Sequence, residues 1–220
     1  MPHAKSRNYD WYCLADPGTT ACFAVAFFAY LPWKERLFAV DEIYETDPIE
    51  TALGNIGPRI IEKASELHIP LDQWTWMYDS AAAWFPVNFH ERWPDSGIVW
   101  QPVEKKANEK EENINVINEL VECNDFLIST KCGNMIWELD NYKRNAKGQI
   151  PKKNDHQIDN LRYMIKHCGI IPNKRQGQDE PREPKVRLTT RMRRYISYEQ
   201  DKRQDESFVG RILRKYHEGE

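Results

Sequence analysis

The sequence predicts an α/β fold in which helices flank a central mixed β-sheet. Three segments near the N-terminus, residues 10–15, 23–30 and 36–44, are rich in aromatic and small apolar residues without helical spacing, and short turns join them. They predict an antiparallel meander. A helical segment follows, and residues 73–78 then read as a fourth strand. Because a strand after a crossover helix is expected to lie parallel to the first strand, the sheet is predicted to be mixed.

The composition indicates a packed, soluble protein with one large domain. The chain has 220 residues, of which 12% are aromatic and 30% charged. No apolar run approaches the length of a membrane span, and residues 1–10 lack the apolar core of a signal peptide. Five Cys residues with no C-x-x-C pair indicate reduced thiols in a cytosol, with Cys13 and Cys22 filling the core.

The net charge of −3 conceals an asymmetry along the chain. Residues 173–220 hold 13 Lys and Arg against 9 Asp and Glu, a net charge of +4, whereas residues 1–172 hold 18 against 25, a net charge of −7. We therefore expect one domain over residues 1–172 and a basic tail over 173–220, whose Pro-rich and charged composition favours disorder or a docking peptide. A polyanionic partner would have to meet local basic patches or this tail.

Asp16 ends the first strand, where the chain enters a Pro-Gly turn. A carboxylate at the mouth of an apolar strand needs a cation or hydrogen-bond donors to offset its desolvation. One interpretation is an Asx-turn, in which Asp16 accepts backbone N–H bonds. The alternative is that Asp16 belongs to a functional site. A second strand that also ends on an Asp favours this alternative.

That second strand is 73–78, which ends on Asp79 and a run of small residues. The preceding helix is predicted to begin at Asp47 as N-cap and to be kinked or interrupted at Gly54, Gly57 and Pro58. Parallel strands end at the same edge of a sheet, so Asp79 is expected beside Asp16. The alternative role for Asp79 is the N-cap of a helix that begins at Ser80.

Residues 84–153 are predicted to alternate between helices and short strands. Helices are expected at 85–93, 105–121 and 135–142, and strands at 97–103 and 126–129. Residues 143–153 carry five Lys and Arg and no acid, together with Gly148 and Pro151, so they predict a basic loop. A charge run of this kind is usually only a solvated surface.

The segment 152–167 carries a helical stripe of apolar residues and brings two more carboxylates together. Asp155 and Asp159 are four residues apart, so both lie on one face near the N-terminus of the helix. Like charges at this spacing repel each other, and either a divalent metal or Arg162 would relieve the repulsion. N-capping by Asn154 or Asp155 is the alternative.

Three sequence motifs, taken together, resemble a known family. ADPGTT at Asp16, YDSAAA at Asp79 and the closing KNDHQIDNLRY are similar in order and spacing to the nuclease domain of large terminase subunits from tailed bacteriophages. The resemblance covers roughly residues 9–172 and implies a ribonuclease H-like fold. The sequence departs from the family at Asn154, where a second Asp is frequent, and at Asn160, where Ala is common. It also has no G-x-x-x-x-G-K-[ST] phosphate loop, so we expect the nuclease without the ATPase motor.

The resemblance implies a metal-dependent endodeoxyribonuclease that cuts concatemeric double-stranded DNA during genome packaging. Asp16, Asp79 and Asp155 are the implied catalytic residues, and with Asp159 they would hold two Mg²⁺ or Mn²⁺ ions, which activate a water and stabilise the leaving oxygen. Which of Asp155 and Asp159 is the main third ligand stays open.

The implied partners are DNA, the terminase ATPase domain, the small terminase subunit and the portal protein, with the isolated domain a monomer in the host cytoplasm. The basic residues expected to hold the DNA backbone without reading its sequence are Lys105, Lys106, Lys143, Arg144, Lys147, Lys152 and Lys153. We expect the tail to contact the portal or other packaging proteins. Two alternatives share this fold: another nuclease, such as a Holliday-junction resolvase or a transposase-like enzyme, and a non-catalytic DNA-binding or assembly module.

Overall fold

The computed structural model describes residues 9–18, 22–105, 109–142 and 154–170. Six strands form one sheet in the order β5-β4-β1-β2-β3-β6. The strands are β1 (Asp10–Pro17), β2 (Phe23–Leu31), β3 (Arg36–Glu45), β4 (Trp74–Tyr78), β5 (Trp100–Pro102) and β6 (Phe126–Ile128). The first three form the expected antiparallel meander. The other three pair in parallel, β4 with β1, β5 with β4 and β6 with β3, which confirms the mixed sheet.

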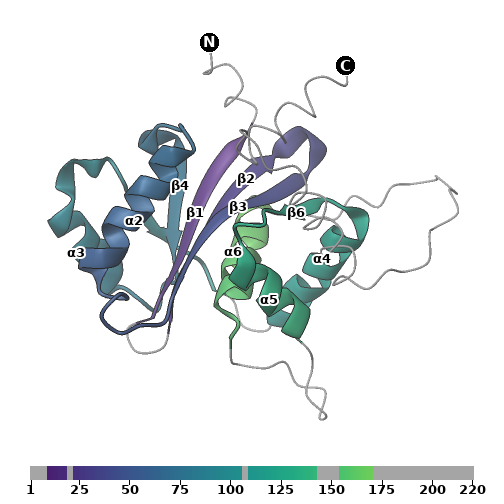
Figure 1. The fold of residues 1–220 in the computed structure, drawn as a ribbon. Coiled ribbons are helices and arrows are strands. Elements are labelled where there is room, and N and C mark those ends of the chain that lie inside the picture. The colour runs from purple at the N-terminus through teal and green to yellow at the C-terminus, as the bar shows by residue number, and fades with distance from the viewer. Residues whose placement is uncertain (1–8, 19–21, 106–108, 143–153, 171–220) are drawn as a thin grey trace, which may run out of the picture.

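Helices cover both faces of this sheet (Figure 1). One face carries α2 (Leu53–Glu66) and α3 (Trp84–Arg92). The other carries α4 (Glu109–Cys123), α5 (Gly133–Asn141) and α6 (His156–Cys168). Short 3-10 helices occupy Pro32–Lys34, Leu71–Gln73 and Pro94–Ser96. Among the described residues, no helix is both long and apolar enough to span a bilayer.

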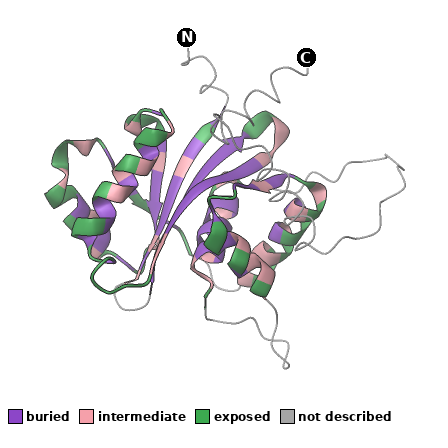
Figure 2. Cartoon of the chain, in the orientation of Figure 1, coloured by how far each residue is buried: buried purple, intermediate pink, exposed green. Residues whose placement is uncertain are grey.

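The central strand β2 explains why its segment is apolar at every position. All nine of its residues are buried, and from Val25 to Leu31 they alternate between two hydrophobic clusters, one on each side of the sheet (Figure 2). Val25 and Phe27 pack toward α2 and α3, whereas Ala26 and Phe28 pack toward the α4–α6 side. A strand covered on both faces has no position at which water favours a polar residue.

The α2–α3 side is filled mainly by aromatic rings. The ring of Phe85 packs against those of Phe89 and Trp100, with centroids 5.8 and 4.7 Å away, and these two rings also contact each other. α2 meets this group through Gly57, where any side chain would collide with the ring of Trp93. The glycine is therefore explained by close packing rather than by a break in the helix.

The start of α2 differs from the expectation. The side chain of Asp47 accepts the N–H of Ile49 at 2.8 Å and its carbonyl accepts the N–H of Thr51 at 2.8 Å, which closes a separate turn. Ala52 then adopts an extended conformation, and the helix begins only at Leu53. Asp47 thus caps a turn. The helix that follows is continuous from Leu53 to Glu66 with Pro58 inside it, so the predicted interruption was wrong.

The other predicted elements agree with the structure to within a few residues. The strand expected at 97–103 is reduced to Trp100–Pro102, and the helix expected over 105–121 is described from Glu109 to Cys123. All five cysteines are free thiols, and Cys13 and Cys22 are buried as expected. Helix α6 begins directly after Asp155.

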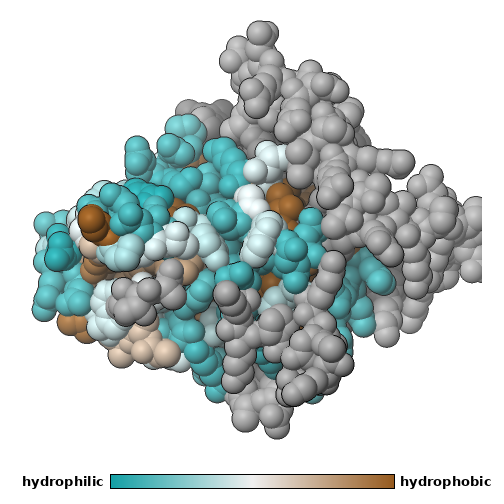
Figure 3. Space-filling view, turned by 60° about the horizontal axis from the view of Figure 1, so that its bottom comes forward, coloured by the Kyte–Doolittle hydropathy of each residue, from teal (hydrophilic) through white to brown (hydrophobic). Residues whose placement is uncertain are grey.

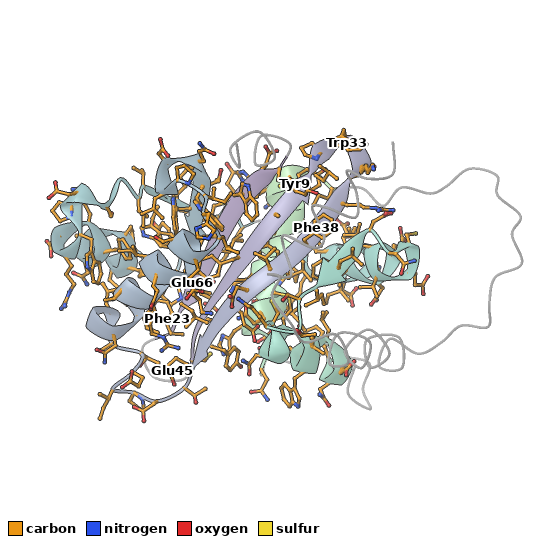
Figure 4. The ribbon with its side chains drawn as sticks, turned by 45° about the horizontal axis from the view of Figure 1, so that its top comes forward. Tyr9, Phe23, Trp33, Phe38, Glu45 and Glu66 are labelled. Carbon is orange, nitrogen blue, oxygen red and sulfur yellow. The ribbon has the colours of Figure 1, made fainter. Side chains whose placement is uncertain are left out.

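The sheet has two distinct ends (Figure 4). Phe23 and Glu45, which pair with each other, mark the end at which β1 and β4 also terminate. Trp33 marks the opposite end, at the connection between β2 and β3. The described surface near the carboxyl ends of β1 and β4 is mainly hydrophilic (Figure 3).

Candidate active site

Asp16 and Asp79 lie on neighbouring strands at the same end of the sheet. The parallel register pairs Ala15 with Tyr78, and the N–H of Asp79 donates to the carbonyl of Ala15 at 2.9 Å. Neighbouring strands are about 4.8 Å apart, so the two aspartates leave the sheet side by side. This placement at one edge confirms the sequence-based expectation.

Both aspartates point to the face covered by α6. Leu14 and Met77, each two residues earlier, pack in the cluster on that face. Side chains alternate along a strand, so Asp16 and Asp79 project to the same side. Contacts from α6 to both of them agree with this direction.

The carboxylate of Asp16 meets an imidazole. Oδ2 of Asp16 lies 2.7 Å from Nδ1 of His156, the first residue of α6. The hydrogen bond to Asp16 is the largest cause of a raised pKa at His156, which favours the charged imidazolium. In the described part of the chain, the turn at Asp16 is closed by its backbone carbonyl, which accepts the N–H of Gly18 at 3.1 Å.

Asp79 is held by three donors. Its Oδ2 accepts hydrogen bonds from Lys105 Nζ at 2.7 Å and from the Tyr163 hydroxyl at 3.1 Å, and its Oδ1 accepts the N–H of Ala81 at 2.8 Å. Burial by itself raises the pKa of Asp79, but these donors outweigh it, so the pKa lies below its ordinary value. The residue does cap a turn, but α3 begins only at Trp84, so Asp79 is not the N-cap of that helix.

Asp155 and Asp159 share one lysine. Nζ of Lys110 lies 2.7 Å from Oδ2 of Asp155 and 3.8 Å from Oδ1 of Asp159. Asp159 also forms an ion pair with Arg162, the partner that the sequence suggested. Burial is the largest influence on Asp159 and raises its pKa, against the opposing effect of Arg162 and Lys110. Asp155 occupies the N-cap position, but within the described residues its side chain makes no capping bond.

Two buried glutamates cap helices instead. Glu138 on α5 accepts the N–H groups of Gln157 and Ile158 through Oε2, at 2.8 and 3.0 Å, at the start of α6. Glu42 on β3 does the same for α5, accepting the N–H groups of Asn134 at 2.6 Å and Met135 at 3.0 Å. Helix N-termini expose unpaired N–H groups and attract negative charge, so each carboxylate fixes the helix it faces. Through these two steps the sheet positions the helix that carries Asp155 and Asp159.

A buried amide anchors α6 to the sheet as well. Nε2 of Gln157 donates to the carbonyls of Val25 and Ile43, at 3.2 and 3.3 Å. These carbonyls belong to β2 and β3, so the first turn of α6 is tied directly to two strands.

Of the basic residues predicted to bind DNA, the structure describes Lys105 alone. It contacts Asp79 and is 40% exposed. The others, Lys106, Lys143, Arg144, Lys147, Lys152 and Lys153, lie outside the described residues, as do most of the predicted basic loop and the tail.

The donor set has the chemistry of a site for a hard divalent cation. Four carboxylates supply oxygen ligands of the kind that suits Mg²⁺ or Mn²⁺, and all four remain partly accessible. Across the described residues, no three His, Cys, Asp or Glu side chains are arranged to hold an ion. Each carboxylate instead contacts a cationic side chain of the protein. The oxygen ligands and negative charge of these residues therefore fit a divalent ion, and side-chain cations contact the same carboxylates.

Three residues of this site were not singled out from the sequence. His156 and Tyr163 lie inside the motif that contains Asp155, and they directly follow Asp155 and Arg162 in the sequence. That adjacency could have identified them as site residues. Lys110 gave no such signal, because 45 residues separate it from Asp155.

No protein-family model matches the sequence, and no curated protein matches it. Solved structures do match. The nuclease domain of the g2p large terminase of bacteriophage SPP1, with bound Mn, aligns with a TM-score of 0.57 at 16% identity, over 76% of this chain and 91% of that one. The P22 large terminase nuclease domain aligns with a TM-score of 0.56 at 13% identity, over 75% and 84% of the two chains.

A large terminase from a thermophilic bacteriophage aligns with a TM-score of 0.56 at 18% identity, over 72% of this chain and 40% of that one. At these identities the similarity establishes the fold. The chain has the ribonuclease H-like fold of terminase nuclease domains, as the sequence motifs led us to expect.

Proposed function

We propose that this chain is the nuclease domain of a large terminase subunit and hydrolyses phosphodiester bonds in double-stranded DNA. One observation carries the proposal. Asp16 and Asp79 lie at the ends of adjacent parallel strands, and α6, which carries Asp155 and Asp159, contacts both of them. The shared fold with terminase nuclease domains, one of them solved with bound Mn, supports it.

In this proposal Asp16, Asp79 and Asp155 are the catalytic carboxylates and Asp159 assists in binding metal. When bound, two Mg²⁺ or Mn²⁺ ions supply an activated water and stabilise the leaving oxygen. Lys110 contacts both Asp155 and Asp159, but Asp159 is also paired with Arg162. Asp155 is therefore favoured as the main third ligand.

The neighbouring side chains orient these ligands. His156 holds Oδ2 of Asp16, and the hydroxyl of Tyr163 holds Oδ2 of Asp79. Both belong to α6, so docking of this helix sets the direction of both strand-end carboxylates. Fixed ligands lose less freedom when they bind a cation, which favours binding.

The substrate and partners follow from the same proposal. The acidic body repels DNA until cations neutralise the site, and the basic residues predicted from the sequence would hold the phosphates without reading bases. The biological role is cutting of concatemeric phage DNA at packaging, in the host cytoplasm, together with an ATPase motor domain, a small terminase subunit and a portal. The tail over 173–220 is proposed to contact packaging proteins.

Incubation of the full chain with supercoiled plasmid tests the proposal. We expect nicked and linear DNA with Mg²⁺ or Mn²⁺ and intact plasmid with EDTA. Asp16→Asn should remove the activity, and Asp72→Asn should keep it, because Asp72 is exposed and precedes β4 at the opposite end of the sheet. Cleavage that resists EDTA, or that persists unchanged in Asp16→Asn, would overturn the proposal.

A further inference from the structure

Two lysines sit directly on the carboxylates of the proposed metal site. Lys105 follows β5 and bonds Asp79 through an ammonium within reach of both carboxylate oxygens. Lys110, near the start of α4, bonds Asp155 at 2.7 Å and lies 3.8 Å from Asp159. Three of the four site carboxylates therefore face an ammonium group.

Aromatic rings support both ammonium groups. Nζ of Lys105 lies 5.5 Å from the ring centroid of Tyr163, and Nζ of Lys110 lies 5.9 Å from that of Tyr142. Cations over aromatic faces at such distances are attracted by the ring. The hydroxyl of Tyr163 also donates to Asp79, so the same residue orients the carboxylate and seats the lysine. Each lysine therefore has both a carboxylate and an aromatic ring as partners at this position.

An ammonium group and a divalent ion compete for one carboxylate. Both are attracted to the same oxygens and repel each other, so an ion that approaches Asp79 or Asp155 meets an occupied position. A lysine side chain is long and rotates freely, and 30–40% of each of these two is exposed, so it can swing into solvent at low cost.

We propose that Lys105 and Lys110 are exchangeable counter-ions. They hold Asp79, Asp155 and Asp159 in place when no ion is bound, and they leave when a divalent ion binds. This inference rests on the proposed metal-dependent nuclease. As a consequence, the two lysines weaken the affinity of the site for the ion. They are positioning residues, because they act through the aspartates.

Substitution by methionine isolates this effect, because methionine keeps an unbranched chain without the charge. We expect Lys105→Met and Lys110→Met each to bind Mn²⁺ about five- to tenfold more tightly than the wild type, the equivalent of one partly exposed ion pair. The measurement is titration of the full chain with Mn²⁺, without DNA, followed by electron paramagnetic resonance of the free ion. Lys34→Met is the matched control, because Lys34 lies over Trp33 at the opposite end of the sheet.

A gain in affinity separates this role from a structural one, since a variant that only loosened the fold would bind the ion more weakly. Lys105→Arg and Lys110→Arg sharpen the test: arginine keeps the charge and should bind Mn²⁺ no more tightly than the wild type. Melting curves without metal show whether each variant is folded. If a methionine variant is unfolded, Lys105→Gln or Lys110→Gln replaces it.

The outcomes distinguish the two proposals. If the wild type binds Mn²⁺ and cuts plasmid but neither uncharged variant binds more tightly, the counter-ion role is wrong and the nuclease stands. If the wild type neither binds Mn²⁺ nor cuts, the proposed function fails and takes this inference with it.

Discussion

Two sets of carboxylates in this protein meet different kinds of partner. Glu42 and Glu138 are 7% and 1% exposed and accept hydrogen bonds from backbone N–H groups. The aspartates of the site, of which Asp79 and Asp155 are examples, are partly exposed and contact side-chain cations. A backbone N–H cannot move without unwinding a helix, whereas a lysine can rotate away. The first set is therefore committed to holding the fold and the second is available to a ligand.

The pKa values follow the same division for the best-defined members. Burial is the largest influence on Glu42 and Glu138 and raises the pKa of both, despite the N–H bonds that oppose it. The pKa of Asp79 is lowered instead, because Lys105 and its other donors outweigh burial. A charged carboxylate is thus favoured at Asp79 and disfavoured at the two helix caps, whereas burial raises the pKa of Asp159 within the site.

The largest expected effect is on the site aspartates. Asp16→Asn, Asp79→Asn and Asp155→Asn each keep the shape but remove a charge and a strong ligand, so we expect plasmid cleavage to fall by about a thousandfold, or about 4 kcal/mol. Each variant should stay folded, and its melting temperature should fall only slightly, because each substitution removes one partly exposed ion pair. A loss of activity that tracks a loss of folding would place these residues with the structural set.

The next effect is on stability and separates the two glutamates. Both oxygens of Glu42 accept hydrogen bonds, from Asn134 and from Met135, so in Glu42→Gln an NH₂ group faces a donor and unfolding should become easier by about 1–3 kcal/mol. Oε2 of Glu138 alone accepts both of its backbone N–H groups, and a glutamine carbonyl reproduces that contact. Glu138→Gln should therefore cost less than Glu42→Gln in urea denaturation, and the reverse order would contradict this account of the caps.

Asp159 tests the division inside the site. Asp159→Asn should retain measurable activity with an altered metal dependence, about tenfold below the wild type (about 1.4 kcal/mol), because Arg162 already occupies part of its carboxylate. The measurement is the cleavage rate across a series of Mg²⁺ and Mn²⁺ concentrations. An inactive Asp159→Asn beside an active Asp155→Asn would reverse the assignment of the third ligand.

The smallest effect is a pH dependence. The folded-state pKa of Glu42 is raised above its unfolded value, so its contribution to stability is fully present below the unfolded pKa and is lost as the pH rises through the folded pKa. Glutamine does not titrate there. The stability advantage of the wild type over Glu42→Gln should accordingly be larger at pH 4 than at pH 8, measured by denaturation at both. An advantage that grows with pH would show that the N–H bonds outweigh burial.

The sequence predicted those parts of the site that depend on local pattern. Asp16 and Asp79 each end a strand, and the crossover rule alone places them at one edge. The four-residue spacing of Asp155 and Asp159 likewise fixes a common face of α6, and Arg162 is within the same helix. Such features need no knowledge of distant contacts.

The rest depends on contacts between remote segments. Glu42 reads as one charged residue in a strand, and its partners on α5 lie 92 and 93 residues away. Glu138 sits on a short helix whose pattern does not reveal which polar residues are buried. The predicted start of α2 was wrong because Asp47 closes a separate turn before the helix. The capping pattern in the sequence is the same for such a turn and for a helix start.

The pairing of Asp16 with His156 joins residues 140 positions apart, at the two ends of the described chain. During synthesis the sheet emerges from the ribosome well before α6 does. Contacts of such long range form late and slowly compared with local ones. Every strand can therefore be in place while the strand-end carboxylates still lack their helix, and the site is completed only when the last described helix docks.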